Sequence, residues 1–208
     1  MQRHELILGG QKSGKSRLAE QRAADWLRVA GLDTTVLEST ALADVGPGAA
    51  PARQAVLLAT AFAGDTEMAV RIARHQADRA QRVPRLSTVE AAPDLALALA
   101  RHSRPERLVV IDCLTLWLTQ LLMPLHGPGA GDAACASQCR RLLQALAQAP
   151  GPVVLVSNEI GLGVSPLSAE ARCFIDLQGR LHQQLAAVCE RVTLMVAGCA
   201  LAIKRETA

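Results

Sequence analysis

Residues 9–16 have the spacing of a loop that binds phosphate groups: Gly9, four intervening residues, then Gly14, Lys15 and Ser16. Glycines let successive backbone N–H groups turn toward phosphate oxygens. In this pattern the lysine reaches the β- and γ-phosphates, and the serine hydroxyl can bind Mg²⁺. We therefore expect a nucleoside triphosphate to be bound by Gly9, Gly10, Gln11, Lys12, Ser13, Gly14, Lys15 and Ser16.

The neighbouring residues favour this interpretation over a chance match in a glycine-rich turn. The apolar residues 6–8 precede the loop, and a helical pattern follows from residue 17. This is the strand–loop–helix order that the motif requires. The N-terminus of the predicted helix adds positive partial charge to the same site.

Asp112 is a candidate metal ligand for this site. It ends the apolar run 108–111, and a carboxylate at the end of a buried strand can hold Mg²⁺ beside a phosphate loop. We expect Ser16 and Asp112 to bind that ion together. The alternative is that Asp112 caps a helix that begins near Leu114.

His75 lies on a predicted helix over residues 65–79, on one face with Met68, Ile72 and Arg79. From this spacing alone, a packed or solvated histidine is favoured over a nucleophile. An imidazole can nevertheless carry a nucleotidyl group covalently, because it both attacks and leaves readily. Neighbouring arginines could stabilise phosphate charge.

Residues 157–163 follow a third apolar run, 153–156, and contain a polar pair and two glycines. Such a loop at the end of a strand is typical of an active site, although an ordinary turn toward Pro166 is the alternative. We take its candidate substrate residues to be Asn158, Glu159, Gly161 and Gly163. Gly179 falls inside a predicted helix, where glycine costs about 1 kcal/mol, so close packing or approach of a ligand is suspected.

Strands and helices alternate along the chain. We expect strands over 55–60, 108–112, 153–157 and 192–196, with residues 201–203 closing an edge. We expect helices over 17–30, 65–79, 94–102, 114–123, 132–148 and 168–190, and a loop over 80–92. This order predicts an α/β fold of the P-loop NTPase type: a mostly parallel sheet with helices on both faces, in a single domain over 1–208. Ligands should bind at the carboxyl ends of the strands.

Composition excludes several classes of protein. The net charge of +3 is scattered, without the basic stripe expected of a nucleic-acid-binding protein. The longest uncharged stretch, 113–131, is broken by polar residues, proline and glycines, so we expect no membrane span. The six cysteines form no C-x-x-C pair and are interpreted as small apolar residues in a reducing compartment. With no signal-peptide pattern at the N-terminus, we expect a cytoplasmic protein.

Several of these segments, taken in order, resemble the bifunctional adenosylcobinamide kinase / adenosylcobinamide-phosphate guanylyltransferase family of cobalamin biosynthesis. The resemblance extends over nearly the whole chain. Its marks are residues 9–16, Glu67-Met68 with Arg71, Ile72 and His75, residues 112–118, residues 158–163, and Ala197-Gly198 with Ile203-Lys204.

The resemblance implies two reactions. The family phosphorylates adenosylcobinamide with a nucleoside triphosphate, ATP or GTP, and then transfers GMP from GTP to adenosylcobinamide phosphate through a guanylylated histidine. The products are adenosylcobinamide-GDP and pyrophosphate. His75 matches that histidine, with Lys15 as the second catalytic residue, and the family tends to form a small homo-oligomer, a trimer. Positions that match contacts to the guanine nucleotide are Ala59, Thr60, Ala61, Gln76, Ala77, Asp78, Arg79, Glu90 and Asp112.

The chain departs from the family pattern in four places. Residues 27–53 look like an insertion, and the loop after His75 is longer than usual, with Leu86 where an aromatic residue is common. Residues 164–168 replace the usual Val-Pro-Glu-Asn run, and His182 stands where asparagine is common. The last two concern contacts to the acceptor substrate.

Two alternatives remain open from the sequence. One is a P-loop kinase of another small hydroxylated metabolite, with His75 in a structural role. The other is a nucleotide-dependent switch or assembly ATPase. Nucleotide preference and covalent labelling of the protein distinguish these alternatives from the bifunctional enzyme.

Overall fold

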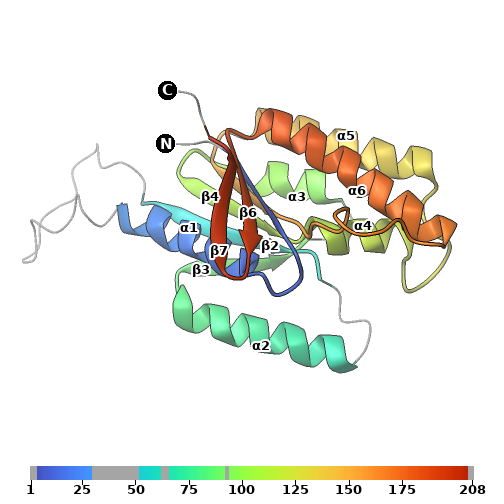
Figure 1. Ribbon diagram of the computed structural model, residues 1–208. Helices are drawn as coiled ribbons and strands as arrows, with labels where there is room; N and C mark the ends of the chain where they lie inside the picture. The colour runs from blue at the N-terminus through green and yellow to red at the C-terminus, as the bar shows by residue number, and fades with distance from the viewer. Residues whose placement is uncertain (1–3, 30–51, 62–65, 92–93, 206–208) are drawn as a thin grey trace, which may run out of the picture.

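Figure 1 shows the computed structural model, which describes residues 4–29, 52–61, 66–91 and 94–205. A seven-stranded sheet runs through this part of the chain in the order β3-β2-β4-β5-β1-β6-β7. Strands β1 to β6 are parallel to their neighbours, and β7 is antiparallel to β6. The strands are β1 His4–Gly9, β2 Gln54–Ala59, β3 Leu86–Glu90, β4 Arg107–Asp112, β5 Val153–Val156, β6 Arg191–Val196 and β7 Cys199–Lys204.

Helices cover both faces of this sheet, which confirms the predicted α/β fold (Figure 1). One face packs against α3 to α6, and the other packs against α1, with α2 on the same side. The helices are α1 Lys15–Val29, α2 Thr66–Arg82, α3 Leu95–His102, α4 Leu114–Leu122, α5 Asp132–Gln148 and α6 Ala169–Val188.

The two faces of the central strands supply two apolar clusters. Leu6, Ile111 and Leu155 face the helices α3 to α6, whereas Ile7 and Val110 face α1. Strands buried on both faces need continuous apolar runs rather than an alternating pattern. This explains why the runs ending at residues 112 and 156 were recognisable in the sequence.

Local capping interactions fix the start of two helices. The side chain of Asp94 accepts a hydrogen bond from the N–H of Leu97 at the start of α3, and the Ser168 hydroxyl accepts one from Ala171 at the start of α6. Such bonds satisfy backbone N–H groups that the first helical turn leaves unpaired. None of the helices in the described part of the chain is both long and apolar enough to cross a membrane.

The expectation of a loop over residues 80–92 is wrong. Helix α2 continues to Arg82, and β3 pairs in parallel with β2 from Leu86 to Glu90. Strand β3 forms an edge of the sheet, so only Leu86 is buried and the rest of its side chains are partly or fully exposed. An edge strand of this kind lacks the continuous apolar run that marks the central strands.

Most of the proposed insertion over 27–53 lies outside the described residues. Its first residues, Leu27 to Val29, are the last residues of α1. At its other end, the guanidinium of Arg53 lies 4.2 Å from the ring centroid of Trp26. The insertion itself therefore stays a prediction.

A buried carboxylate joins α1 to α2. The side chain of Glu20 is 3 % exposed, and its oxygens lie 3.5 Å from Nε of Arg79 and 2.7 Å from Nε of Arg82. Arg79 also donates a hydrogen bond of 3.1 Å from Nη1 to Oγ1 of Thr88 in β3. The C-terminal end of α2 is thus attached to α1 by the buried carboxylate of Glu20, whose charge water screens little.

We expect the substitution Glu20→Ala to lower the free energy of unfolding by about 3–5 kcal/mol, because it leaves the buried charge of Arg79 without its partner. The matched control is Asp25→Ala in the same helix. Asp25 pairs with Arg28 at the surface, so that substitution should change stability by no more than about 0.5 kcal/mol. Urea denaturation of both variants measures the difference. Equal stabilities would contradict a structural role for Glu20.

Candidate active site

The phosphate loop connects β1 to α1 and is closed by the hairpin of β6 and β7. Gly9 has a φ of +151°, and a Cβ atom there would lie 2.4 Å from the backbone oxygen of Met195. The N–H of Gly198, in the turn of the hairpin, donates a 3.0 Å hydrogen bond to the backbone oxygen of Ser13. Only glycine fits at residue 9, and the turn Ala197-Gly198 supports the loop from outside.

Lys15 is the first residue of α1 and is buried. Its Nζ donates a 2.6 Å hydrogen bond to the backbone oxygen of Gly10, within the loop. Burial lowers the pKa of Lys15, and the nearby carboxylate of Asp112 opposes this effect. The ammonium group therefore lies inside the loop, where the phosphates of a nucleotide would need a counter-charge.

Asp112, at the end of β4, is connected to the phosphate loop through Ser16. The Ser16 hydroxyl lies near enough to the Asp112 carboxylate to favour its ionised form. Burial raises the pKa of Asp112, and the neighbouring Ser16 hydroxyl and the charges of Arg79 and His75 oppose that rise. A hydroxyl and a carboxylate are the hard oxygen ligands that Mg²⁺ prefers, so these two residues fit the predicted ion.

The α2 residues expected at the site occupy different environments. His75, Gln76 and Ala77 are exposed, Asp78 is half-buried, and Arg79 is buried against Glu20. His75 lies near enough to Asp112 for its charge to affect that carboxylate. The structure therefore leaves the imidazole of His75 accessible and engages Arg79 in the attachment of α2.

Five of the predicted nucleotide contacts lie where β2, β3 and β4 end. In the register of the sheet, Ala59 lies opposite both Glu90 and Asp112. The hydroxyl of Thr60, the next residue, donates to the backbone oxygen of Cys113 and accepts from its N–H, at 2.6 and 2.8 Å. The half-buried Ala61 follows. These residues and the phosphate loop lie at the same end of the sheet, where the parallel strands have their carboxyl ends.

The loop after β5 lies directly against the start of the phosphate loop. The N–H of Glu159 donates a 2.9 Å hydrogen bond to the backbone oxygen of Gly9, and the N–H of Asn158 donates one of 2.8 Å to Oγ1 of Thr115. Oε1 of Glu159 accepts a hydrogen bond from the N–H of Gly161. Gly161 and Gly163 are both exposed.

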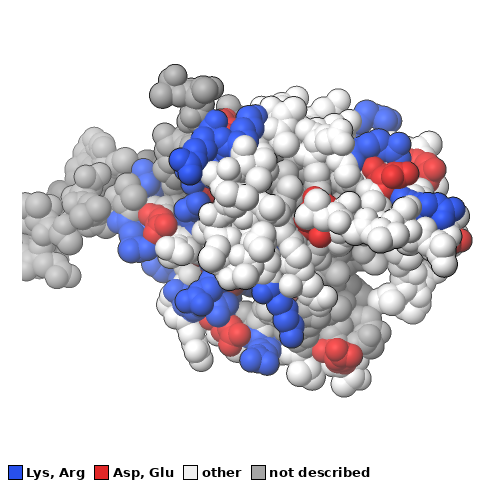
Figure 2. Space-filling view, in the orientation of Figure 1, with Lys and Arg blue, Asp and Glu red and all other residues white. Residues whose placement is uncertain are grey.

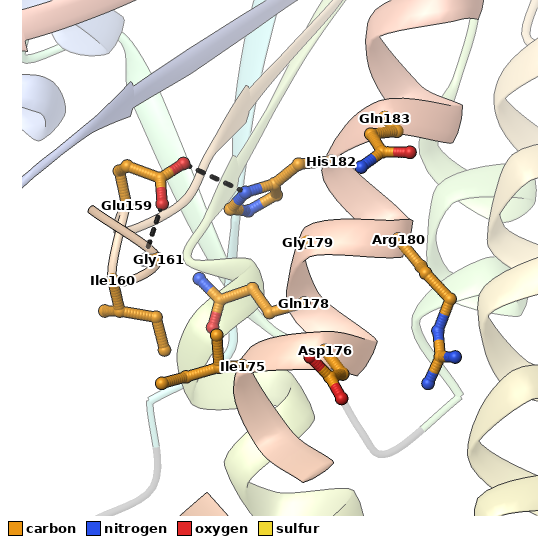
Figure 3. Close-up of a pocket in the computed structure, with 10 residues that line it drawn as sticks. All are labelled: Glu159, Ile160, Gly161, Ile175, Asp176, Gln178, Gly179, Arg180, His182 and Gln183. Carbon is orange, nitrogen blue, oxygen red and sulfur yellow. Dashed lines mark hydrogen bonds and ion pairs between the residues drawn. The ribbon is translucent and has the colours of Figure 1, made fainter. Parts of the chain in front are cut away.

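A buried polar network that sequence analysis did not find supports this loop. The hydroxyl of Ser157 lies 2.7 Å from Nε2 of His182. Nδ1 of His182 lies 3.6 Å from Oε2 of Glu159, a contact drawn as a dashed line in Figure 3. Nε2 of Gln178 donates to the hydroxyls of Thr115 and Ser157 and to the backbone oxygen of Asn158. The only signal in the sequence is that Gln178 and His182 lie four residues apart on an otherwise apolar helix face.

The order Ser157, His182, Glu159 has the chemical types of a nucleophilic triad, but its geometry is unsuited to that role. Ser157 has no exposed surface, and its hydroxyl is shared by His182, Thr115 and Gln178. A substrate could not reach it. We therefore interpret these residues as the support of the loop after β5.

The comparisons with known proteins identify the family. A family model described as cobinamide kinase / cobinamide phosphate guanyltransferase matches residues 41–203. The chain belongs to this family. It is 41 % identical to the bifunctional adenosylcobalamin biosynthesis protein CobP of Pseudomonas aeruginosa, over 97 % of this chain and 98 % of that protein. It is 32 % identical to the bifunctional adenosylcobalamin biosynthesis protein CobU of Escherichia coli, over 96 % and 98 %.

Family membership confirms the resemblance described above and the assignment of the chain as a kinase and nucleotidyltransferase. It favours the bifunctional enzyme over a kinase of another metabolite or an assembly ATPase. It does not test the roles of single residues, which stay predictions.

The buried histidine predicts a pH dependence of stability. Burial lowers the pKa of His182, and the Glu159 carboxylate opposes that shift. The folded protein thus binds a proton at His182 less readily than the unfolded chain, whose histidines titrate near pH 6.5. The contribution of His182 is fully present above about pH 6.5, and the free energy of unfolding decreases as the pH falls below that value.

Urea denaturation between pH 7.5 and 5.5 should show this decrease in the wild type and a smaller one in His182→Asn. The control is His126→Asn, at an exposed residue, which should keep the pH dependence of the wild type. An unchanged pH dependence in His182→Asn would mean that another group is responsible.

Proposed function

We propose that this protein phosphorylates adenosylcobinamide with a nucleoside triphosphate, ATP or GTP, and then transfers GMP from GTP to the phosphate it has made. The products are adenosylcobinamide-GDP and pyrophosphate. One observation carries the proposal beyond family membership. The buried Lys15 donates a hydrogen bond inside the phosphate loop, Asp112 ends β4 at the same end of the sheet, and His75 is exposed on α2.

In the kinase step, the hydroxyl oxygen of the acceptor attacks the γ-phosphorus of the triphosphate. The bond from that phosphorus to the β,γ-bridging oxygen breaks, the nucleoside diphosphate leaves, and the hydroxyl proton passes to solvent. The backbone N–H groups of residues 10–16 and the Lys15 ammonium hold the phosphates in line and stabilise their charge. Ser16 and Asp112 would hold Mg²⁺, which neutralises further phosphate charge.

In the guanylyl step, a ring nitrogen of His75 attacks the α-phosphorus of GTP, and the bond to the α,β-bridging oxygen breaks to release pyrophosphate. A phosphate oxygen of adenosylcobinamide phosphate then attacks the same phosphorus. The phosphorus–nitrogen bond breaks, which restores the free imidazole and leaves GMP joined to the acceptor. The exposure of His75 supports this role, since both the nucleotide and the acceptor must reach it.

The residues at the ends of β2 and β3 and on α2 complete the proposed nucleotide site. Glu90 is exposed at the end of β3 beside Ala59, and Gln76 is exposed next to His75. Arg79 adds positive charge to this site from its buried position, in which contacts with Glu20 and Thr88 hold its side chain. The proposed contacts remain Ala59, Thr60, Ala61, Gln76, Ala77, Asp78, Arg79, Glu90 and Asp112.

Three further properties belong to the proposal. The protein acts in the cytoplasm, which its six free cysteines support. No nucleic-acid partner is proposed, since the net charge is +3, and on the face drawn in Figure 2 basic and acidic side chains are interspersed. It assembles as a homotrimer, for which the edge strand β7 offers the exposed Leu201 and Ile203.

Covalent labelling tests the guanylyl step. Purified protein incubated with Mg²⁺ and GTP labelled at the α-phosphate should retain label after denaturation, and the bond should be labile in acid and stable in base. The substitution His75→Ala should abolish the label, because it removes the attacking nitrogen. The control is His126→Ala, which removes another exposed histidine and should label like the wild type.

A folded wild-type protein that binds GTP but gains no label would overturn the covalent step. Transfer of the γ-phosphoryl group to cobinamide, followed separately with GTP or ATP labelled at that position, tests the kinase step. If the wild type gives neither product, the proposed function is wrong as a whole.

A further inference from the structure

A pocket of about 440 Å³ lies at the end of the sheet opposite the phosphate loop. Strands β2 and β4 begin there, at Gln54 and Arg107, and they end at the candidate active site, at Ala59 and Asp112. The five steps from Gln54 to Ala59, at about 3.3 Å each in a parallel strand, separate the two ends by about 17 Å. None of the nucleotide contacts proposed above lines this pocket.

The walls of the pocket carry positive charge without negative charge. Arg53, Arg85, His102 and Arg107 line it, and none of the described residues around it is acidic. Arg85 is exposed and the other three are half-buried. The guanidinium of Arg53 is held by stacking on the ring of Trp26. These residues come from four separate places in a chain whose net charge is only +3, so the overall charge does not explain their convergence.

The arginines of the pocket are bound to neutral oxygens rather than to carboxylates. Nε and Nη2 of Arg107 donate to Oε1 of Gln54 at 2.9 and 2.6 Å, and its Nη1 donates to the backbone oxygen of His102 at 3.3 Å. Nη2 of Arg85 donates to the backbone oxygen of Arg53 at 3.3 Å. Within the described part of the chain, none of the three arginines forms an ion pair.

These bonds hold the guanidinium groups in place and leave donors for a ligand. A guanidinium carries five N–H donors. The three bonds of Arg107 therefore leave two of its donors, and the single bond of Arg85 leaves four. The bonds from Arg107 to Gln54 and from Arg85 to Arg53 lie at exposed positions, so a ligand can reach both groups.

His102 gives independent evidence that the positive charge is not compensated. Burial lowers the pKa of His102, and the charges of Arg107, Arg104 and Arg101 lower it further. Among the described residues, no carboxylate opposes this shift. An anion in the pocket would oppose it.

The number of donors limits which anion fits. Three guanidinium groups and an imidazole offer more donors than the two oxygens of one carboxylate can use. A phosphate group presents three acceptor oxygens and a charge of about −2, and arginine is the residue preferred for its recognition. Val56 and Val89 add apolar surface to the pocket, and its volume is that of a site for a small molecule.

We propose that this pocket binds a phosphate group, either free as phosphate or pyrophosphate or carried by a small organic molecule, with Arg53, Arg85 and Arg107 as its charged ligands. The site is separate from the phosphate loop and takes no part in the chemistry at Asp112. It goes beyond the proposed function and does not depend on it.

NMR of the histidine ring protons tests the site without turnover of a substrate. Titration with pyrophosphate at about pH 6.5 should shift the signal of His102 in a saturable way, because a bound anion favours the protonated ring. Loss of the signal in His102→Asn assigns it. The shift should persist in Lys15→Ala, which weakens binding at the phosphate loop.

Substitution of single arginines tests the ligands of the anion. Arg85→Gln and Arg107→Gln should each raise the Kd for pyrophosphate, followed at His102, about tenfold, because each removes a charge-assisted hydrogen bond. The matched control is Arg140→Gln, which removes the same charge from an exposed position on α5 and should leave the Kd unchanged. Arg85 is exposed, so its variant keeps the test valid if Arg107→Gln does not fold.

Inorganic phosphate and phenyl phosphate distinguish the two sources of the phosphate group. Tighter binding of phenyl phosphate supports an organic phosphate whose carrier contacts Val56 and Val89. Equal or tighter binding of inorganic phosphate supports a free anion. Acetate at the same ionic strength should not shift the His102 signal.

Three results would overturn the proposal. They are a His102 shift that is lost in Lys15→Ala, a shift that acetate produces equally, and equal Kd values in Arg85→Gln and Arg140→Gln. Binding of heparin more tightly than of pyrophosphate would assign the surface to an extended acidic partner and would also overturn a small-molecule site. None of these measurements involves cobinamide, so the proposed function stands or fails separately.

Discussion

The structure depends on how two opposite charges, Lys15 and Asp112, are kept in the interior beside a site for phosphate. Burial lowers the pKa of Lys15 and raises that of Asp112, so each group on its own would favour its neutral form. The Asp112 carboxylate opposes this effect on Lys15, and the neighbouring Ser16 hydroxyl and the Arg79 guanidinium oppose it on Asp112. Parallel pairing makes this possible, because it brings the carboxyl ends of β1, β5 and β4 to one edge. The glycine at residue 9 and the hairpin turn at Gly198 then hold the loop around that pair.

The second constraint is the polar network beneath the loop after β5. Thr115, Ser157 and Gln178 are buried among apolar side chains of α4 and α6. Apolar residues at these positions would need no hydrogen-bond partners, whereas these polar ones do. Their hydrogen bonds fix the backbone of Asn158 and, through His182, the carboxylate of Glu159. Buried polar groups that satisfy one another hold a segment in one arrangement more specifically than apolar contacts do. The network therefore explains why the loop keeps its position against Gly9 although Gly161 and Gly163 are exposed.

Sequence patterns predicted the parts of the protein that are determined locally. The phosphate loop is contiguous in the chain, and the central strands β2, β4 and β5 are buried on both faces, so each leaves a recognisable run of residues. Strand β3 was missed because an edge strand buries little, and its Ser87, Thr88 and Glu90 are exposed. The network was missed for a different reason. Thr115 and Gln178 are ordinary helix residues whose partnership spans 63 positions, and no local pattern encodes a contact between distant residues.

The two histidines of the site show how the environment decides the role of a residue type. His182 is buried, and both of its ring nitrogens face partners, Ser157 on one side and Glu159 on the other. A nucleophile needs a free lone pair and room for the reacting phosphorus, and His182 has neither. His75 is exposed on α2, and its ring makes no hydrogen bond within the part of the chain that the structure describes. Spacing along the helix favoured a packed or solvated histidine at residue 75, and its exposure now excludes the packed form. The exposure of His75 is compatible with the proposed covalent role, whereas His182 acts by holding Glu159 against the phosphate loop.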